Sequence, residues 1–306
     1  MNVRHLILAP LLAVFVAQAA FAQKTPDHVF QAIGEVEATL RAILEADFVD
    51  TKVAAIEPLP NLRPRHVFAK VVEVSEKFRV MQRLHGLRDR PALTMPAQVV
   101  TSDDVYAAVL VLRARATELL EPYGLGQTET SEPLPTGKTS ADAYARLQSI
   151  SQLFDRAYQP PTVPNDVYRV SQVLAEEAAL LLTTLGARKP LAQTKHLQGK
   201  TPVDGYDLAV ALGTLLDELA TSHSALAPEG GVVVPVSPSG EVTSGSVRDA
   251  VSVVLADLIE MRVNAGATDD VFVAEEPTGK TPSDVYGTLF YSKRLLTVAK
   301  KTRATG

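Results

Sequence analysis

The segment Pro-Thr-Gly-Lys-Thr occurs twice in this chain, at residues 135–139 and 277–281, and Gly-Lys-Thr occurs again at residues 199–201. Gly-Lys-Thr ends the phosphate-binding loop of many nucleotide-binding proteins, in which backbone N–H groups and the lysine hold the phosphates. That loop also requires a glycine five residues before its Gly-Lys. The three copies instead have Glu132, Ala274 and Thr194 at that position. We therefore expect no nucleotide site and interpret the motif as the start of a helix.

The lysine of the motif is not needed for a helix start, so Lys138 and Lys280 are candidates for binding an anion at a helix N-terminus. A repeated aromatic residue is a second candidate for ligand contact. It occupies the same position in seven segments of the chain, as Phe30, Phe68, Tyr106, Tyr144, Tyr168, Tyr206 and Tyr286. A repeated aromatic one turn into a helix is typical of core packing, and we favour that role. Tyr144 and Tyr286, which follow Lys138 and Lys280, are the tyrosines predicted to contact a ligand.

Metal binding and catalysis have weaker support. His28 and His66 occupy equivalent positions and are the only metal candidates, but neither has a second histidine or a carboxylate at ligand spacing. The chain contains no Gly-x-Ser-x-Gly segment, and its charged residues fall where solvated helix faces are expected. We therefore predict no catalytic residue, no cofactor and no metal.

The same short pattern begins eight segments of the chain, here called units: a Thr or Ser, often a Pro, then Asp, a branched or small residue and an aromatic. Five of the seven spacings between units are 38 residues, and one short spacing of 24 residues lies in the middle. The third and fourth units of each half also share their preceding residues. This order predicts a tandem duplication of a four-unit module.

Each unit begins with residues that favour a helix N-terminus. In Thr281-Pro282-Ser283-Asp284 the threonine is the predicted N-cap, proline takes the first helical position and aspartate supports the cap. Apolar residues at helical spacing follow, as from Val105 to Leu119. The predicted capping residues are Thr25, Thr101, Thr139, Asp142, Thr201, Asp204, Thr243, Thr281 and Asp284.

The predicted fold is all-α, with one four-helix module over residues 23–159, a proline-rich junction at 160–164 and a second module over 165–306. A continuous α-solenoid is the alternative. The linkers are long for a helical bundle, so helices within a module could run parallel or up and down. Two valine-rich linker stretches, residues 231–236 and 271–273, are expected to lie along the helices as extended covers.

Residues 1–22 have a basic start, an apolar run and an Ala-Phe-Ala end, which together predict a signal peptide cleaved before Gln23. No later segment is apolar enough to span a membrane, so we expect a periplasmic or secreted protein. The absence of cysteine excludes disulfides, and a net charge of −5 argues against nucleic acid as a partner.

A repeated structural pattern without a catalytic constellation favours a non-catalytic binding or scaffolding protein, whose partner is a protein or a small molecule. Two alternatives remain open. One is a small-molecule or metal binder, or an enzyme, that uses the groove between the modules. The other is a subunit of a self-associating assembly, because eight similar units present similar surfaces.

Overall fold

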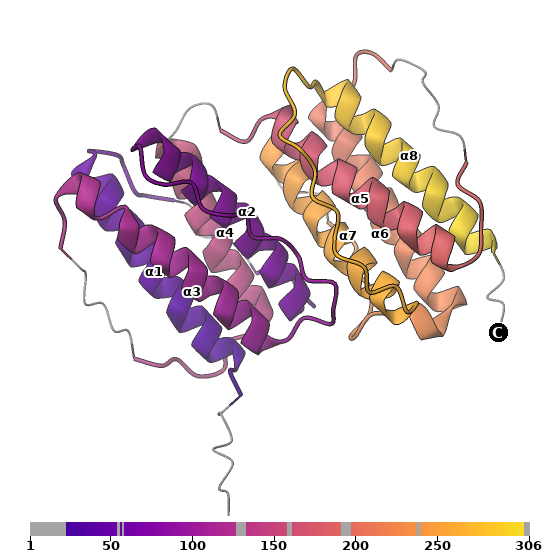
Figure 1. The fold of residues 1–306 in the computed structure, drawn as a ribbon, viewed down its shortest axis with the longest axis horizontal. Helices are drawn as coiled ribbons and strands as arrows, with labels where there is room; N and C mark the ends of the chain where they lie inside the picture. The colour runs from indigo at the N-terminus through magenta and orange to yellow at the C-terminus, as the bar shows by residue number, and fades with distance from the viewer. Residues whose placement is uncertain are drawn as a thin grey trace, which may run out of the picture.

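The computed structural model describes residues 23–53, 56, 58–126, 133–157, 161–190, 197–236, 238 and 240–302. These residues form eight α-helices and no β-strand, which confirms the predicted all-α class (Figure 1). The predicted signal peptide lies outside the described residues. The helices are α1 (Pro26–Ala46), α2 (Pro64–Leu84), α3 (Ser102–Glu118), α4 (Ser140–Ala157), α5 (Pro164–Thr184), α6 (Pro202–Ser222), α7 (Ser244–Asn264) and α8 (Pro282–Lys301). Single 3₁₀ turns, Glu121–Tyr123 and Ser224–Leu226, follow α3 and α6.

The helix starts are held by reciprocal hydrogen bonds between the cap and the third helical residue. In α8 the Asp284 N–H donates to Thr281 Oγ1 at 3.3 Å, and the Thr281 N–H donates to Asp284 Oδ2 at 2.8 Å. This exchange satisfies two of the backbone donors that a helix start leaves free. The same cap N–H to third-residue carboxylate bond occurs at Thr101–Asp104, Thr139–Asp142, Val163–Asp166 and Thr201–Asp204. Thr243 uses the hydroxyl of Ser246 instead.

All four helices of each half point in the same direction. The first turns of α1 to α4 surround one small space, which is lined by Pro26, Pro64, Ser102 and Ser140 together with one residue a turn further along each helix. The first turns of α5 to α8 surround an equivalent space lined by Pro164, Pro202, Ser244 and Pro282. Four starts at one end require parallel helices, so the long linkers return the chain to that end each time.

The helices pack as two groups of four, which we call the first module (α1–α4) and the second module (α5–α8). In each module the first two helices both contact the last two, so that consecutive helices such as α1 and α2 lie diagonally. The modules meet where α2 packs against α7 (Figure 1). Two closed groups joined at one helix pair differ from a continuous solenoid, in which every helix would contact its sequence neighbours. The duplication itself stays a prediction from the sequence. Pro164, assigned to the junction, is the first residue of α5.

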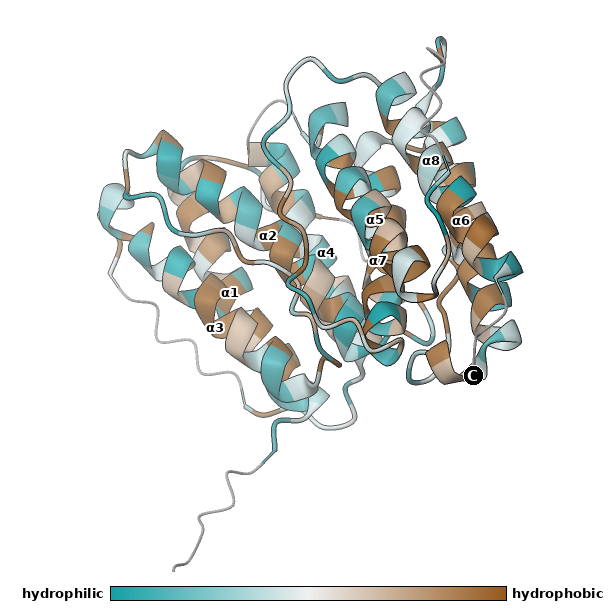
Figure 2. Ribbon diagram, turned by 45° about the vertical axis from the view of Figure 1, so that its right-hand side comes forward, coloured by the Kyte–Doolittle hydropathy of each residue, from teal (hydrophilic) through white to brown (hydrophobic). Residues whose placement is uncertain are grey.

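Apolar side chains fill the interior of both modules, while polar residues cover the outer helix faces (Figure 2). Fully buried residues such as Leu40, Leu112, Leu174 and Leu296 come from helices of both modules. Such stripes stabilise the fold because each helix can bury its apolar face only against its neighbours. Within the part of the chain that the structure describes, no helix is long and apolar enough to span a bilayer.

The two valine-rich linker stretches are extended and lie against the helices. The linker of residues 265–281 runs back across α5 and α7 in Figure 1, and the Phe272 N–H donates to Glu177 Oε1 of α5 at 3.3 Å. The stretch of residues 231–236 crosses α6 at Gly213, where a Cβ would lie 2.9 Å from Pro235 Cδ. Both predicted covers are therefore extended chain along helices, without a sheet.

Candidate functional site: a groove between the modules

The interface between α2 and α7 contains buried charges that bind one another. Arg65 at the start of α2 contacts Asp257 (Nε to Oδ1, 2.6 Å) and Glu260 (Nη1 to Oε2, 3.2 Å) near the end of α7. The start of α2 therefore meets the end of α7, and the two helices are antiparallel. His66 Nε2 also lies 2.9 Å from Asp257 Oδ1. Each of these side chains is at most 5% exposed, so the charges are fully desolvated and must be paired.

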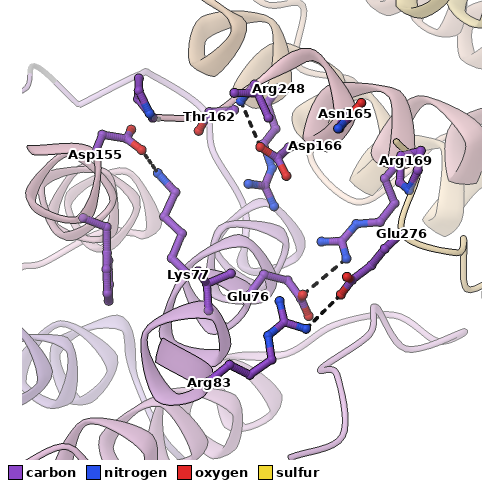
Figure 3. Close-up of a pocket in the computed structure, with 15 residues that line it drawn as sticks. Glu76, Lys77, Arg83, Asp155, Thr162, Asn165, Asp166, Arg169, Arg248 and Glu276 are labelled. Carbon is purple, nitrogen blue, oxygen red and sulfur yellow. Dashed lines mark hydrogen bonds and ion pairs between the residues drawn. The ribbon is translucent and has the colours of Figure 1, made fainter. Parts of the chain in front are cut away.

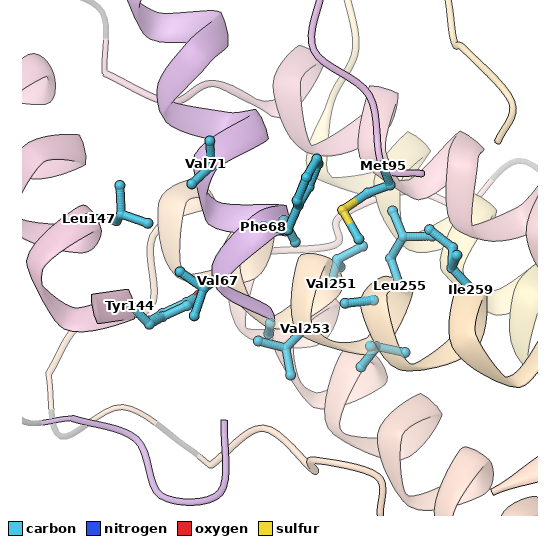
Figure 4. Close-up of a cluster of buried hydrophobic side chains, with 14 of the residues drawn as sticks. Val67, Phe68, Val71, Met95, Tyr144, Leu147, Val251, Val253, Leu255 and Ile259 are labelled. Carbon is cyan, nitrogen blue, oxygen red and sulfur yellow. The ribbon is translucent and has the colours of Figure 1, made fainter. Parts of the chain in front are cut away.

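Apolar side chains pack beside this network and complete the interface. Phe68 of α2 and Met95 of the following linker lie against Val251, Leu255 and Ile259 of α7 (Figure 4). This contact excludes water from the adjacent ion pairs, which strengthens the electrostatic interaction between their charges.

A second charged cluster lies further along the same interface. Lys70 Nζ contacts Glu73 Oε2 at 2.8 Å within α2 and Asp249 Oδ1 at 2.7 Å across to α7. The Gln148 side chain of α4 donates to the other Asp249 oxygen at 3.2 Å. Burial raises the pKa of the Asp249 carboxyl to about 6, against the opposing effect of Lys70. Although burial opposes it, the charges of Lys70, Arg248 and Lys77 hold the pKa of Glu73 well below its usual range.

A groove of about 920 Å³ opens beside Asp249 and is lined by both modules. The first module contributes α4 and the linker before α2, and the second contributes α6, α7 and the extended linker between them. Most lining side chains are apolar, and the polar ones gather near Asp249. The lining residues include Ile56, Leu59, Pro60, Tyr144, Gln148, Tyr206, Val232, Val233, Val234, Pro235, Val236, Asp249, Ala250 and Val253.

Tyr144 supplies an unused hydrogen-bonding group in this groove. Its side chain is 3% exposed, and its hydroxyl is buried without a hydrogen-bond partner among the described residues. Burial, together with the negative charge of Asp249, raises the pKa of Tyr144 well above its usual value, so the hydroxyl keeps its proton and can donate. The neighbouring Tyr206 hydroxyl already donates to the Val236 carbonyl. A buried hydroxyl without a partner costs free energy, and a bound acceptor would remove that cost.

Lys138, Lys280 and Tyr286 lie away from the groove, at the starts of the helices. Lys138 Nζ lies 4.6 Å from the centroid of the Phe30 ring, and Lys280 Nζ lies 4.4 Å from that of Tyr168. The Tyr286 ring is covered by Lys200, at 4.3 Å. Lys24 covers Tyr106 in the same way, at 4.8 Å. Each lysine comes just before one helix and covers a ring on a neighbouring helix.

The backbone of these lysines binds the same neighbouring helix. The Lys138 N–H donates to Asp27 Oδ1 of α1 at 2.7 Å, and the Lys280 N–H donates to Asn165 Oδ1 of α5 at 2.8 Å. Each lysine thus joins two parallel helix starts through one hydrogen bond and one cation–π contact. The structure therefore places the Gly-Lys-Thr lysines in contacts between helices.

The repeated aromatic position has two environments. Four of its rings lie at the helix starts under the lysines named above, while Phe68, Tyr144 and Tyr206 are buried, at 6%, 3% and 7% exposure. Tyr144 also has a lysine over its ring, the buried Lys70, at 5.9 Å. Tyr144 and Tyr206 line the groove, so of the two predicted ligand tyrosines the structure places only Tyr144 there.

The two histidines act at helix starts. His28 Nδ1 accepts the Thr25 N–H at 3.3 Å and His66 Nδ1 accepts the Arg63 N–H at 2.8 Å, so imidazole takes the position that aspartate has elsewhere. No group of three potential metal ligands occurs among the described residues.

Asp249 and Arg248 are not among the site residues predicted from the sequence. Nothing in the pattern around Asp249 distinguishes it from an ordinary charge on a helix. Arg248, in contrast, occupies the position that is aromatic in the other seven units. This exception could have identified Arg248 as a candidate site residue. Comparison of the chain with known protein families, with curated proteins and with solved structures finds no match.

Proposed function

We propose that this chain is an exported, non-catalytic binding protein that holds a small organic molecule in the groove between its two modules. The ligand has an apolar body, which fits the valines and prolines of the groove, and a hydrogen-bond acceptor for Tyr144. The observation that carries the proposal is the unpartnered, buried Tyr144 hydroxyl in a groove of about 920 Å³.

The size and composition of the groove support a small ligand. Ligand sites are concave, mostly apolar and about 300–1,000 Å³ in volume, and they occur preferentially where two domains meet. The groove meets each of these conditions. Asp249 and Gln148 add polar groups at one side, which would orient an asymmetric molecule.

The first experiment is native mass spectrometry of protein purified, without denaturation, from the cells that produce it. We expect a bound species in addition to the polypeptide, which denaturation releases for identification. A spectrum with only the polypeptide mass, even at the gentlest desolvation, would contradict the proposal.

The second experiment tests the groove with the released molecule. Tyr144→Phe removes the hydroxyl and little else, so it should weaken binding by roughly tenfold while leaving the folded state at least as stable. Tyr291→Phe is the matched control, because Tyr291 lies outside the groove. Equal ligand affinities for the wild type and Tyr144→Phe would show that the ligand does not bind in this groove.

Export is a separate part of the proposal, based on the signal-peptide pattern of residues 1–22. N-terminal sequencing of the protein from its native cells should give Gln23 as the first residue. A chain that still begins at Met1 in the extracytoplasmic fraction, or that stays in the cytoplasm, would contradict export.

A further inference from the structure

A second pocket between the modules contains a concentration of charged side chains. It encloses about 250 Å³ and lies between the second half of α2, the end of α4 and the starts of α5 and α7 (Figure 3). Arg248 of α7 lines this pocket, whereas the next residue, Asp249, lines the groove described above. The two cavities are therefore neighbours with separate polar groups.

Almost every charge in this pocket has a partner. Three ion pairs account for six of the charged residues: Lys77–Asp155 at 2.7 Å, Arg83–Glu276 at 3.2 Å and Arg169–Glu76 at 3.3 Å. The remaining acid, Asp166, accepts the Val163 N–H at 2.9 Å and thereby caps its own helix. Arg248 is the one charged residue of the lining that has no hydrogen-bonded or ion-pair partner among the described residues.

Arg248 is largely buried, and its guanidinium has no hydrogen-bonded partner among the described residues. Only 7% of the residue is exposed, and it forms no hydrogen bond or ion pair with any residue that the structure describes. In Figure 3 it lies between Lys77 and Arg169. Outside the pocket its charge acts on Glu73, which is already bound by Lys70 and by the Ser151 hydroxyl. Buried guanidinium groups are normally paired, because an unpaired buried charge is costly.

The start of α5 adds further donors to the same space. The Thr162 hydroxyl oxygen lines the pocket and is likewise buried without a partner. The positive end of the α5 dipole faces the same region, since Val163 and Asn165 also line it. Arg248 and the start of α5 thus offer unused hydrogen-bond donors around one small volume.

We propose that this pocket binds the oxyanion of a small molecule, a carboxylate or a phosphate, through a two-pronged contact with the Arg248 guanidinium. Guanidinium groups bind both oxyanions in this geometry. The pocket is smaller than the groove and polar, so it suits a compact acid. Because α2 and α4 line one side while α5 and α7 line the other, the bound anion connects the two modules.

The test is calorimetric titration of the full chain with inorganic phosphate and, separately, with succinate, at constant ionic strength. Binding of one of these anions to the wild type is expected, and the one that binds more tightly identifies the oxyanion. Arg248→Met should weaken this binding by roughly 10- to 100-fold, because charge-assisted hydrogen bonds are lost. Arg113→Met, on the outer face of the first module, is the matched control and should bind like the wild type.

Thermal unfolding without anion separates a binding role from a structural role. In the empty pocket Arg248 has no hydrogen-bonded partner and only a longer-range attraction to Glu73, so Arg248→Met should melt close to the wild-type temperature. Arg248→Lys keeps the charge without the two-pronged geometry and should bind more weakly than the wild type. The proposal is overturned if the wild type binds neither anion at millimolar concentration, or if both Arg248 variants bind with wild-type affinity.

Discussion

Lys138 and Lys280 show how a residue that suggests chemistry can serve the fold. Each lies just before a helix, covers an aromatic ring on a neighbouring helix and donates its backbone N–H to that helix. The glycine before each lysine has a positive φ, 77° at Gly137 and 67° at Gly279, which glycine adopts without strain. Gly-Lys-Thr is thus explained residue by residue as a turn, a contact between helices and a cap.

The contact between Lys280 and Tyr168 should be measurable by a double-mutant cycle. Combining Lys280→Gln with Tyr168→Leu should give a coupling energy of about 0.5–1 kcal/mol in urea unfolding, because a cation over an aromatic face contributes that much at a surface. Combining Lys280→Gln with Tyr286→Leu is the control, since Lys200 covers Tyr286. Equal coupling energies in the two cycles would show that the coupling does not arise from the contact between Lys280 and Tyr168.

The cap at the start of α8 gives a second prediction for a single residue. Thr281→Ala should lower the free energy of unfolding by about 1 kcal/mol, because Thr281 Oγ1 accepts the Asp284 N–H. Thr288→Ala in the same helix should be neutral or stabilising, because the half-buried Thr288 side chain bonds only to a carbonyl of its own helix. Equal melting temperatures for the wild type and Thr281→Ala would refute the role of the cap.

At the scale of elements, an extended linker can approach a helix closely only where the helix has a small residue. Gly213 lies where the extended linker crosses α6, and a Cβ there would lie 2.9 Å from Pro235 Cδ and 3.3 Å from Val234 Cα. Glycine inside a helix weakens it relative to alanine, so its presence here is explained by the crossing chain.

Two glycine substitutions should therefore have opposite effects. Gly287→Ala in α8, where a Cβ meets nothing within 4 Å, should raise the free energy of unfolding by about 0.5–1 kcal/mol. Gly213→Ala should lower it, because the gain in helix propensity is smaller than the cost of displacing the linker. Chemical unfolding of both variants checks this, and stabilisation by Gly213→Ala would mean that the linker is not held on α6.

The helices were predictable because their signals are local. Thr281 and Asp284 lie three residues apart, and their roles follow from helix geometry alone. The direction of the helices was not predictable from the sequence. A linker such as residues 265–281 is long enough to start the next helix at the same end of the module, but it can equally form a long loop between antiparallel helices. Only the packing of four starts around one space decides between these arrangements.

At the scale of the whole molecule, the junction of α2 and α7 brings together groups that no local pattern connects. Tyr144 could be nominated from the repeat, because its position recurs. Its missing hydrogen-bond partner depends on the placement of α4 and α7, which no spacing in the sequence encodes. The same holds for Asp249, whose contact with Lys70 links residues on different modules.

Asp249 should make the stability of the protein depend on pH. Its pKa of about 6 in the folded state is above the ordinary 3.8, so the folded protein binds this proton more tightly than the unfolded chain. The contribution of Asp249 to the free energy of unfolding should therefore fall by roughly 2–3 kcal/mol as pH rises from about 4 to about 6, whereas Glu73, whose pKa is lowered, contributes in the opposite direction. Asp249→Asn should remove this decrease, measured by urea unfolding across that range.

The matched control for this measurement is Glu218→Gln, which replaces an exposed carboxylate of α6 far from the interface and should keep the wild-type pH profile. A wild-type profile for Asp249→Asn as well would show that the buried cluster does not cause the pH dependence.

The parallel direction of the helices also has a consequence for the rate of folding. In an up-and-down bundle, adjacent helices form hairpins, whose contacts are close in sequence. Here each pair of touching helices is separated by at least one returning linker, and α1 touches α3 and α4 but packs only diagonally to α2. Such a topology has a high contact order for a helical protein, and folding rates fall as contact order rises. We expect this chain to fold more slowly than up-and-down helical bundles of its size.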